Sequence, residues 1–343
     1  MLYQLPANPN MRDRLVEEIR ARGIGFPVTE GLRSLVATKS GNDSLLRHTL
    51  EEAERRRANP TSATAKLPPT AEASELLERT RKATLGAVAA MPDYLVKQQI
   101  IRSRALGQTN NYSVYDRLTI AVSYRESAGE DYKLLSVNGM PPSEDQTYGK
   151  KLGGTSSAGE YVTVLSELFK PESRAQFTAV DTDTLRGRST IVYDYEVKKE
   201  FSRQALKWSE GDSSELETIA GYRGRIWVDR ETNRILRLEE ISTDIDPGFP
   251  ITAASETIDY DWVTINEQSH LLPSHAVIAL TSRGRGRTEQ TRNDILFRGY
   301  RKFGAEVKII DIDEKDFPPD KPEKNEPKPP TTPPALKPQP KKP

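Results

Sequence analysis

The three histidines are the residues of this chain best suited to catalysis or metal binding, but their spacing does not indicate a site. His270 and His275 lie five residues apart near the start of an expected strand, where a regular strand would turn them to opposite sides. His48 lies in a separate helical segment, and no zinc-ligand pattern accompanies any of the three. The chain has no cysteine, so thiolate metal sites, disulfides and cysteine nucleophiles are excluded. We expect surface histidines, no metal and no cofactor.

The run Gly154–Gly159 and three Asp-x-Asp pairs are the next candidates for chemistry. The run nearly matches the turn that presents a nucleophilic serine, but its second glycine is misplaced and no strand precedes it. None of the aspartate pairs continues into a calcium loop with its glycine and terminal glutamate. Carboxylate pairs for glycosidic chemistry stay open from spacing alone, although nothing singles out one pair. We therefore predict a loop and strand ends, and no enzyme. The pairs are Asp181 with Asp183, Asp244 with Asp246, and Asp311 with Asp313.

Arginines two residues apart recur in the sequence as Arg-Gly-Arg. Residues two apart on a strand share a face, so each set would aim its guanidinium groups in one direction. A guanidinium suits phosphate and carboxylate, which makes Arg283, Arg285 and Arg287 candidates for an anionic surface such as lipid headgroups. The ordinary alternative, which we favour, is that these arginines are solvated and blunt strand edges. The other two sets are Arg186–Arg188 and Arg223–Arg225.

Composition limits the kind of protein that these residues serve. The 50 basic and 50 acidic residues cancel, which argues against a dedicated nucleic-acid binder. No apolar run is long enough for a transmembrane helix, and the first ten residues show no signal peptide. The protein is therefore cytosolic, or its secretory segment lies outside this sequence.

The order of elements predicts a helical module, a linker, a β domain and a tail. Residues 1–58 carry three short helical patterns, with Thr29 and Asp43 as expected caps, and 59–70 form a linker by composition. Apolar residues in 72–91 follow one helical face up to Pro92. Residues 314–343 form a proline- and lysine-rich tail that we expect to be disordered.

After Pro92 the apolar period changes from 3.6 to 2, which indicates strands with one buried face. One helix is expected to interrupt them, with a capping box at Ser157 and Glu160. Strands joined by short turns favour an antiparallel sheet, here assigned to residues 71–313. Strands are expected near 94–104, 114–125, 131–137, 174–181, 191–198, 222–229, 234–243, 254–265, 274–282, 293–303 and 306–312.

This order resembles the lipoprotein-carrier fold of the LolA/LolB type, within uncharacterised secreted bacterial proteins. The residues that carry the resemblance are Gly224–Asp229, a turn at 231–233, the strand Ile235–Leu238 and Leu272-Pro273 before a later strand. The resemblance implies an α+β fold with a curved antiparallel sheet, an incomplete barrel, whose concave face is covered by helices. It also implies residence in the periplasm, or secretion. The helical module and the tail are foreign to the simple carriers.

The first functional hypothesis is a non-enzymatic cell-envelope protein that binds an apolar or amphipathic ligand, a lipid or lipoprotein acyl chain, between sheet and helix. The second is an envelope scaffold with a filled β core, whose module and tail bind protein partners, and an unrecognised hydrolase is third. A plugged sheet face would favour the scaffold. Candidates for the apolar wall are Leu77, Val88, Leu118, Ile120, Val122, Ile191, Tyr193, Trp227, Tyr260 and Trp262.

Overall fold

The structure is a computed structural model, and it describes most of the chain between Met11 and Phe317. Expectations that fall elsewhere, including the capping box at Ser157 and Glu160, lie outside the described residues. The described residues are 3, 5, 11–40, 43–58, 67–107, 109, 111–143, 146–148, 163–209, 215–284, 286–303 and 309–317.

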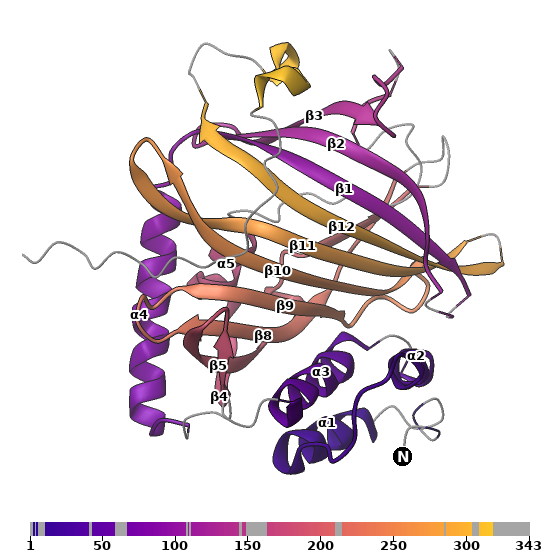
Figure 1. Ribbon diagram of the computed structural model, residues 1–343, viewed down its shortest axis with the longest axis vertical. Helices are drawn as coiled ribbons and strands as arrows, with labels where there is room; N and C mark the ends of the chain where they lie inside the picture. The colour runs from indigo at the N-terminus through magenta and orange to yellow at the C-terminus, as the bar shows by residue number, and fades with distance from the viewer. Residues whose placement is uncertain are drawn as a thin grey trace, which may run out of the picture.

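One ten-stranded antiparallel sheet forms the centre of the molecule, in the order β3-β2-β1-β12-β11-β10-β9-β8-β5-β4 (Figure 1). The sheet does not close, because β3 and β4 are its two ends. The predicted α+β class with an open antiparallel sheet is therefore confirmed. The strands are β1 Tyr94–Leu106, β2 Ser113–Arg125, β3 Gly129–Val137, β4 Gln176–Leu185, β5 Arg188–Val197, β8 Gly221–Asp229, β9 Ile235–Thr243, β10 Ile251–Ile265, β11 Gln268–Gly284 and β12 Arg287–Lys302.

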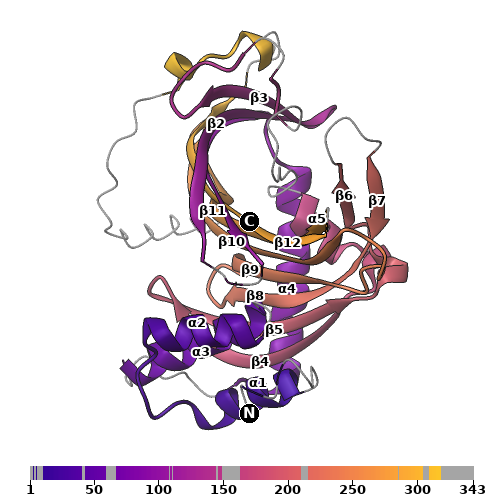
Figure 2. The same cartoon turned by 90° about the vertical axis from the view of Figure 1, so that its right-hand side faces the viewer.

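The sheet is strongly curved, and its two faces carry different layers. Figure 2 shows α4 (Thr70–Ala89) and α5 (Thr163–Phe169) inside the curve and the N-terminal helices outside it. Neighbouring residues of β5 show the division, since Tyr193 donates a hydrogen bond to the Ala73 carbonyl of α4 and Asp194 contacts Arg20 of the N-terminal helices. We call these the concave and the convex face.

Helix α4 covers the concave face with a narrow stripe of small side chains. Its buried residues, Ala73, Leu76, Thr80 and Thr84, recur three or four positions apart and so share one side of the helix. The helix ends at Ala89, shortly before Pro92, as the sequence predicts. Leu77, Leu85 and Val88 of α4 are half-buried beside this stripe, and the remaining large apolar side chains of the layer come from the sheet and from α5, where Leu168 and Phe169 are buried.

The N-terminal helices form a module with its own small apolar core. They are α1 (Met11–Arg22), α2 (Glu30–Lys39) and α3 (Ser44–Ala58). The predicted caps are present: Thr29 Oγ1 accepts from the Leu32 N–H at 3.3 Å, and Asp43 Oδ1 accepts from the Leu46 N–H at 2.8 Å. The buried residues of its core are Leu5, Val16, Val28, Val36, Leu46 and Leu50.

The chain after β12 turns onto the convex face and packs there. A 3₁₀ turn, Ile309–Asp311, takes the place of the end of the strand predicted for 306–312, so the prediction is wrong for these residues, and residues 304–308 lie outside the described part. A second 3₁₀ turn, Glu314–Asp316, follows. Phe317 is only 5% exposed, so the packed chain extends past the predicted boundary at Asp313. Ile309, Ile312 and Phe317 form this cluster with Phe303 and with Leu95 of β1 and Ala121 of β2.

A short hairpin and one glycine complete the architecture around the concave face. The hairpin joins β6 (Ala205–Trp208) to β7 (Leu216–Ile219), and the sequence did not predict it. A Cβ atom at Gly224 would lie 1.8 Å from the Glu239 carbonyl oxygen and 2.9 Å from the Tyr195 hydroxyl. The glycine therefore leaves room for that hydroxyl to cross β8 and contact β9.

Candidate functional site

The predicted apolar wall is built on the concave face, and the chain itself fills it. Six of its sheet residues are 2% exposed or less, and all belong to one apolar cluster that includes Leu76 of α4. Leu77 and Val88 of α4 are half-buried against the same cluster. These side chains are thus already in contact with other side chains of the protein. The six residues are Leu118, Ile120, Val122, Ile191, Tyr193 and Tyr260.

The two tryptophans predicted for that wall lie elsewhere. Trp227 pairs with Val192 and follows Ile226, which is the partner of Tyr193, so the Trp227 ring lies on the convex face. Its Nε1 donates to Asp183 Oδ2 at 3.0 Å. Trp262 is 41% exposed and lies under the guanidinium of Arg234, 5.8 Å from its ring centroid. The Trp227 ring therefore cannot line a concave ligand site, and the Trp262 ring is not packed into the buried wall.

Two of the three arginines predicted as an anionic surface do not share a face. Arg283 and Arg287 are exposed at the hairpin between β11 and β12, and Arg285 lies outside the described residues. Arg283 pairs with Thr288, and Arg287 pairs with Gly284, so the two side chains leave opposite faces. The expectation of one shared direction is wrong here because the hairpin turn lies between them.

The other Arg-Gly-Arg sets are engaged in ion pairs. At the turn between β4 and β5, Arg186 contacts Asp259 and Arg188 contacts Asp229. On β8, Arg225 is completely buried. Its ion pairs are the centre of a charged network that the sequence did not predict.

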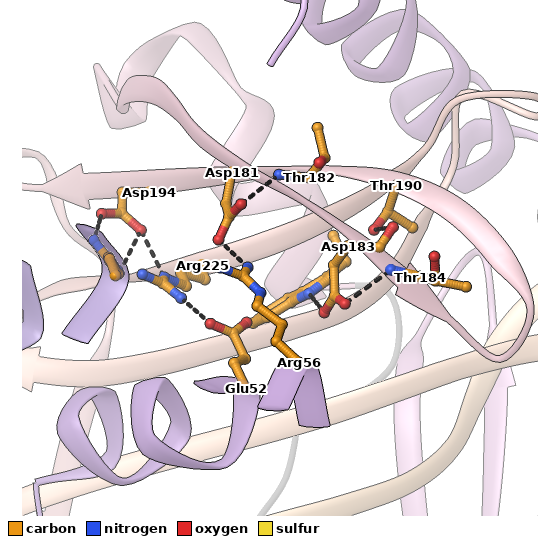
Figure 3. Close-up of polar contacts among 11 residues, drawn as sticks. Glu52, Arg56, Asp181, Thr182, Asp183, Thr184, Thr190, Asp194 and Arg225 are labelled. Atoms are coloured by element: carbon orange, nitrogen blue, oxygen red, sulfur yellow. Dashed lines mark hydrogen bonds and ion pairs between the residues drawn. The ribbon is translucent and has the colours of Figure 1, made fainter. Parts of the chain in front are cut away.

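Arg225 connects the helical module to the sheet (Figure 3). Its Nη1 donates to Glu52 Oε2 of α3 at 2.9 Å, and its Nε donates to Asp194 Oδ1 of β5 at 2.8 Å. The side chains of Arg225 and Glu52 are 1% and 4% exposed. This is a fully buried ion pair between two parts of the chain that lie 173 positions apart.

Two further arginines of the module reach the same face. Arg20 of α1 donates from Nη1 to Asp194 Oδ2 at 3.0 Å, so Asp194 is held by two guanidinium groups. Burial raises the pKa of Asp194, and Arg20 opposes that shift. Arg56 of α3 forms a short ion pair with Asp181 of β4 (Figure 3). Burial is the largest single influence and works against the charge of Arg56, but the hydrogen bond and charge of Asp181, together with the nearby charges of Glu52 and Asp183, raise the pKa of Arg56 overall.

The first Asp-x-Asp pair therefore serves this interface rather than a strand end. Asp183 Oδ2 accepts from Trp227, and Asp183 Oδ1 accepts from the Thr184 N–H at 2.8 Å. Asp181 meets the module and Asp183 meets the sheet (Figure 3). The sequence signal, available in retrospect, is a pair of charges two positions apart within a strand, as at Asp181 and Asp183 of β4 and at Arg223 and Arg225 of β8.

A second, more open line of charges crosses the convex face beside the module. Arg237 of β9 holds Asp259 of β10 with two hydrogen bonds of 2.8 Å. His275 of β11 lies 2.9 Å from Asp294 of β12, and its other ring nitrogen faces Asp259. Hydrogen bonds to these two carboxylates raise the pKa of His275 to about 9. His275 is therefore a cation in an ion-paired row, and it is not a simple surface histidine.

These contacts define what the convex face can do chemically. Its described acids and bases neutralise one another in pairs, which suits adhesion between elements. Among the described residues no group of three or more histidine, aspartate or glutamate side chains could hold a metal ion. In the same part of the chain, no helix has the length and hydropathy needed to cross a membrane.

An open, curved antiparallel sheet around one long helix defines an α+β half-barrel. No protein-family model matches the chain, and no curated protein does. Solved structures do match at low similarity. A DUF1329 family protein from Desulfovibrio piger has 9% identity and a TM-score of 0.32, covering 71% of this chain and 99% of the other.

Two further structures are similar in the same weak way. A Vibrio parahaemolyticus domain, described as that of an outer membrane lipoprotein-sorting protein, has 11% identity and a TM-score of 0.26, covering 70% of this chain and 94% of the other. A chain of the Pseudomonas aeruginosa MucA/MucB complex has 10% identity and a TM-score of 0.19, covering 66% and 94%. A lipoprotein-sorting domain is thus among the matches, in line with the resemblance in the sequence. At these values the likeness says nothing about a ligand or an activity.

Proposed function

We propose that this protein is a non-enzymatic interaction protein of the bacterial cell envelope, with the β domain as a filled scaffold and the convex face as its working surface. One observation carries the proposal: six side chains predicted to contact a ligand are 2% exposed or less in contacts within the chain. A carrier needs an apolar cleft that its cargo can enter. A scaffold needs a rigid core with charged groups placed on its surface.

The charges of the convex face support a binding role over a catalytic one. Catalytic acids and bases need a partly free group beside a cleft. Here Arg225, Asp194 and Asp259 each satisfy two charged partners. Groups that are paired in this way fix the geometry of an interface.

Lipid analysis tests the proposal directly. Protein purified from its own organism would be examined by native mass spectrometry and by lipid extraction, and then titrated with a fluorescent fatty acid. We expect no bound lipid and no rise in melting temperature, because the concave face is filled. A stoichiometric lipid that raises the melting temperature by mass action would overturn the scaffold reading.

Acyl-chain binding is the second candidate, and the packing of α4 favours it. The fully buried stripe of this 20-residue helix contains two threonines, one alanine and one leucine, and its further apolar contacts, at Leu77, Leu85 and Val88, are only half-buried. Burial of an acyl chain in place of this contact would contribute about 0.8 kcal/mol of binding free energy per CH₂. In the titration above, Leu77→Asp should abolish binding, with far-UV circular dichroism confirming that the variant is folded.

Residence in the envelope is part of the same proposal. It is supported by the sequence resemblance to lipoprotein carriers, and protein partners are expected there. Cell fractionation with an epitope tag tests the location. Recovery of the tagged protein only with the cytoplasmic fraction would reject it.

A further inference from the structure

The contact between the helical module and the sheet joins two separate apolar clusters. The module buries its apolar residues in one cluster, the sheet buries its own in another, and the two clusters share no residue. Three ion pairs join the two parts: Glu52–Arg225, Arg20–Asp194 and Arg56–Asp181. Charge therefore helps to determine where the module sits.

The charges of the two surfaces are complementary. The module contributes two arginines and one glutamate to these pairs, and the sheet contributes two aspartates and one arginine. At three points, therefore, a charge on α1 or α3 faces a charge of opposite sign on β4, β5 or β8. Such a pattern selects one partner surface and rejects others, because a like charge at any point is costly.

Ion pairs of this kind give selectivity with little net stabilisation. Burial of Arg225 and Glu52 removes both charges from water, and that cost offsets much of their attraction. Buried nitrogens of Arg20, Arg56 and Arg225 also have no hydrogen-bond partner in the described part of the protein. The docked state of the module is therefore specific but only moderately favoured over an undocked one.

The connection between module and β domain is long enough for the module to reach another molecule. Residues 59–69 separate the end of α3 at Ala58 from the start of α4 at Thr70. At 3.3–3.6 Å per residue, this segment can span roughly 40 Å.

We propose that the convex face of β4, β5 and β8 also docks the helical module of a second copy of this chain, by reciprocal exchange. All three ion pairs re-form in the exchanged dimer, so its free energy differs from that of two monomers only through the linker and the entropy of association. The inference goes beyond the proposed scaffold function and depends on this interface alone.

Charge reversal at Arg56 and Asp181 tests the exchange. Two chains are made, one with Arg56→Asp and one with Asp181→Arg. Within each monomer, the substitution places two like charges opposite each other. In an exchanged dimer of the two, one site unites both reversed charges and the other keeps the native pair. This position is chosen because both side chains are partly exposed, at 26% and 17%, so reversal perturbs folding less than it would at Arg225.

Native mass spectrometry of the mixed variants gives the readout. We expect a mixed dimer whose dissociation constant is at least about tenfold below that of the native homodimer. The matched control carries both reversals in one chain, which restores the intramolecular pair and should return the native, weaker dimerisation. Mixed variants that remain monomeric at the concentrations where the native chain does would overturn the proposal.

A second measurement decides the question if either reversal variant fails to fold. The native chain has no cysteine, so Arg56→Cys in one chain and Asp181→Cys in another are unique reactive sites. Exchange predicts that a short bis-maleimide links the two different chains, increasingly with protein concentration. A link that forms only when both cysteines are in the same chain would overturn exchange, and lipid binding would be unaffected by either result.

Discussion

The two faces of one sheet are covered by different physical means. On the concave face, Tyr193 and its neighbours pack against α4 in an apolar cluster. On the convex face, the residue next to Tyr193, Asp194, is held by Arg20 and Arg225. Apolar packing is non-directional, and its stabilisation grows with the buried area. Buried ion pairs add little net stabilisation and require the correct partner. The concave face thus gives stability and the convex face gives selectivity.

The largest effect is expected from breaking the buried pair on the convex face. Arg225→Met leaves Glu52 buried without its cation, and we expect a loss of about 3–5 kcal/mol in the free energy of unfolding. Urea denaturation measures it. The matched control, Arg225→Met with Glu52→Met, should recover most of the loss. A single variant within about 1 kcal/mol of the native protein would show that the pair is hydrated and the module already undocked.

On the concave face, Ile191→Ala is the corresponding test. Ile191 is fully buried, so the truncation should cost about 2–5 kcal/mol, through lost burial and the cavity that remains. The loss should be the same at low and at high salt, since no charge is involved. A much smaller loss, restored by added fatty acid, would mean that the face contains space for a ligand.

Glu240 is a charged exception on the concave face, and it predicts a pH dependence. It accepts hydrogen bonds from Tyr195 and Gln204, but burial dominates and raises its pKa from 4.5 to about 7. The folded state binds this proton more tightly than the unfolded chain. The contribution is therefore fully present below pH 4.5 and lost as the pH rises through 7, up to about 3 kcal/mol. Glu240→Gln should remove this slope from the urea-derived stability profile, and an unchanged slope would contradict it.

Phe317 is an apolar exception on the convex face. Deleting residues 318–343 should leave the melting temperature unchanged, whereas deleting 317–343 should cost about 1.5–3 kcal/mol because it removes a buried ring. Calorimetry of the two truncations, which differ by one residue, makes the comparison. Equal melting temperatures would show that the ring contributes nothing.

The smallest effect is expected from His275, in the more open row of charges. Its pKa is raised from 6.5 to about 9, so its contribution is present below pH 6.5 and disappears as the pH rises through 9. The side chain is 35% exposed, and solvent screening should keep the effect under about 1 kcal/mol. The difference between His275→Gln and the native protein, measured from pH 6 to 10, checks it. A difference that grows with pH would have the wrong sign.

The sequence predicted the open sheet and α4 because both depend on local periodicity. Leu118, Ile120 and Val122 alternate with Arg117, Thr119, Ala121 and Ser123, three of which are polar, and this pattern reveals a strand and its buried side. β8 is buried on both sides, so its apolar residues form a run, and the face of Trp227 was assigned wrongly. The last strand was predicted wrongly at its described end, because Ile309 and Ile312 pack from a turn into one apolar cluster. The same apolar residues would also be expected in a strand.

The charged network could not be predicted from local pattern. Glu52 and Arg225 lie 173 positions apart, and nothing near either residue indicates its partner. Arg-Gly-Arg did mark important arginines, but the inference of free, solvent-facing groups ignored the carboxylates that the fold brings to them. Pairing of buried charges is a property of tertiary structure, so sequence could supply the candidates and not the pairs.

Gly224 shows how closely the two faces are tied together. The glycine is required by the concave side, where the Tyr195 hydroxyl lies 3.1 Å from the Glu239 carbonyl oxygen and 3.0 Å from Glu240 Oε2. The next residue, Arg225, is required by the convex side, where it receives the module. Two adjacent positions of one strand therefore serve the two opposite faces of the sheet. A one-residue insertion or deletion in β8 would turn each of them to the wrong face. Because a shift of one residue turns every following side chain of a strand to the other face, such a change in β8 would disrupt the packing on both faces together.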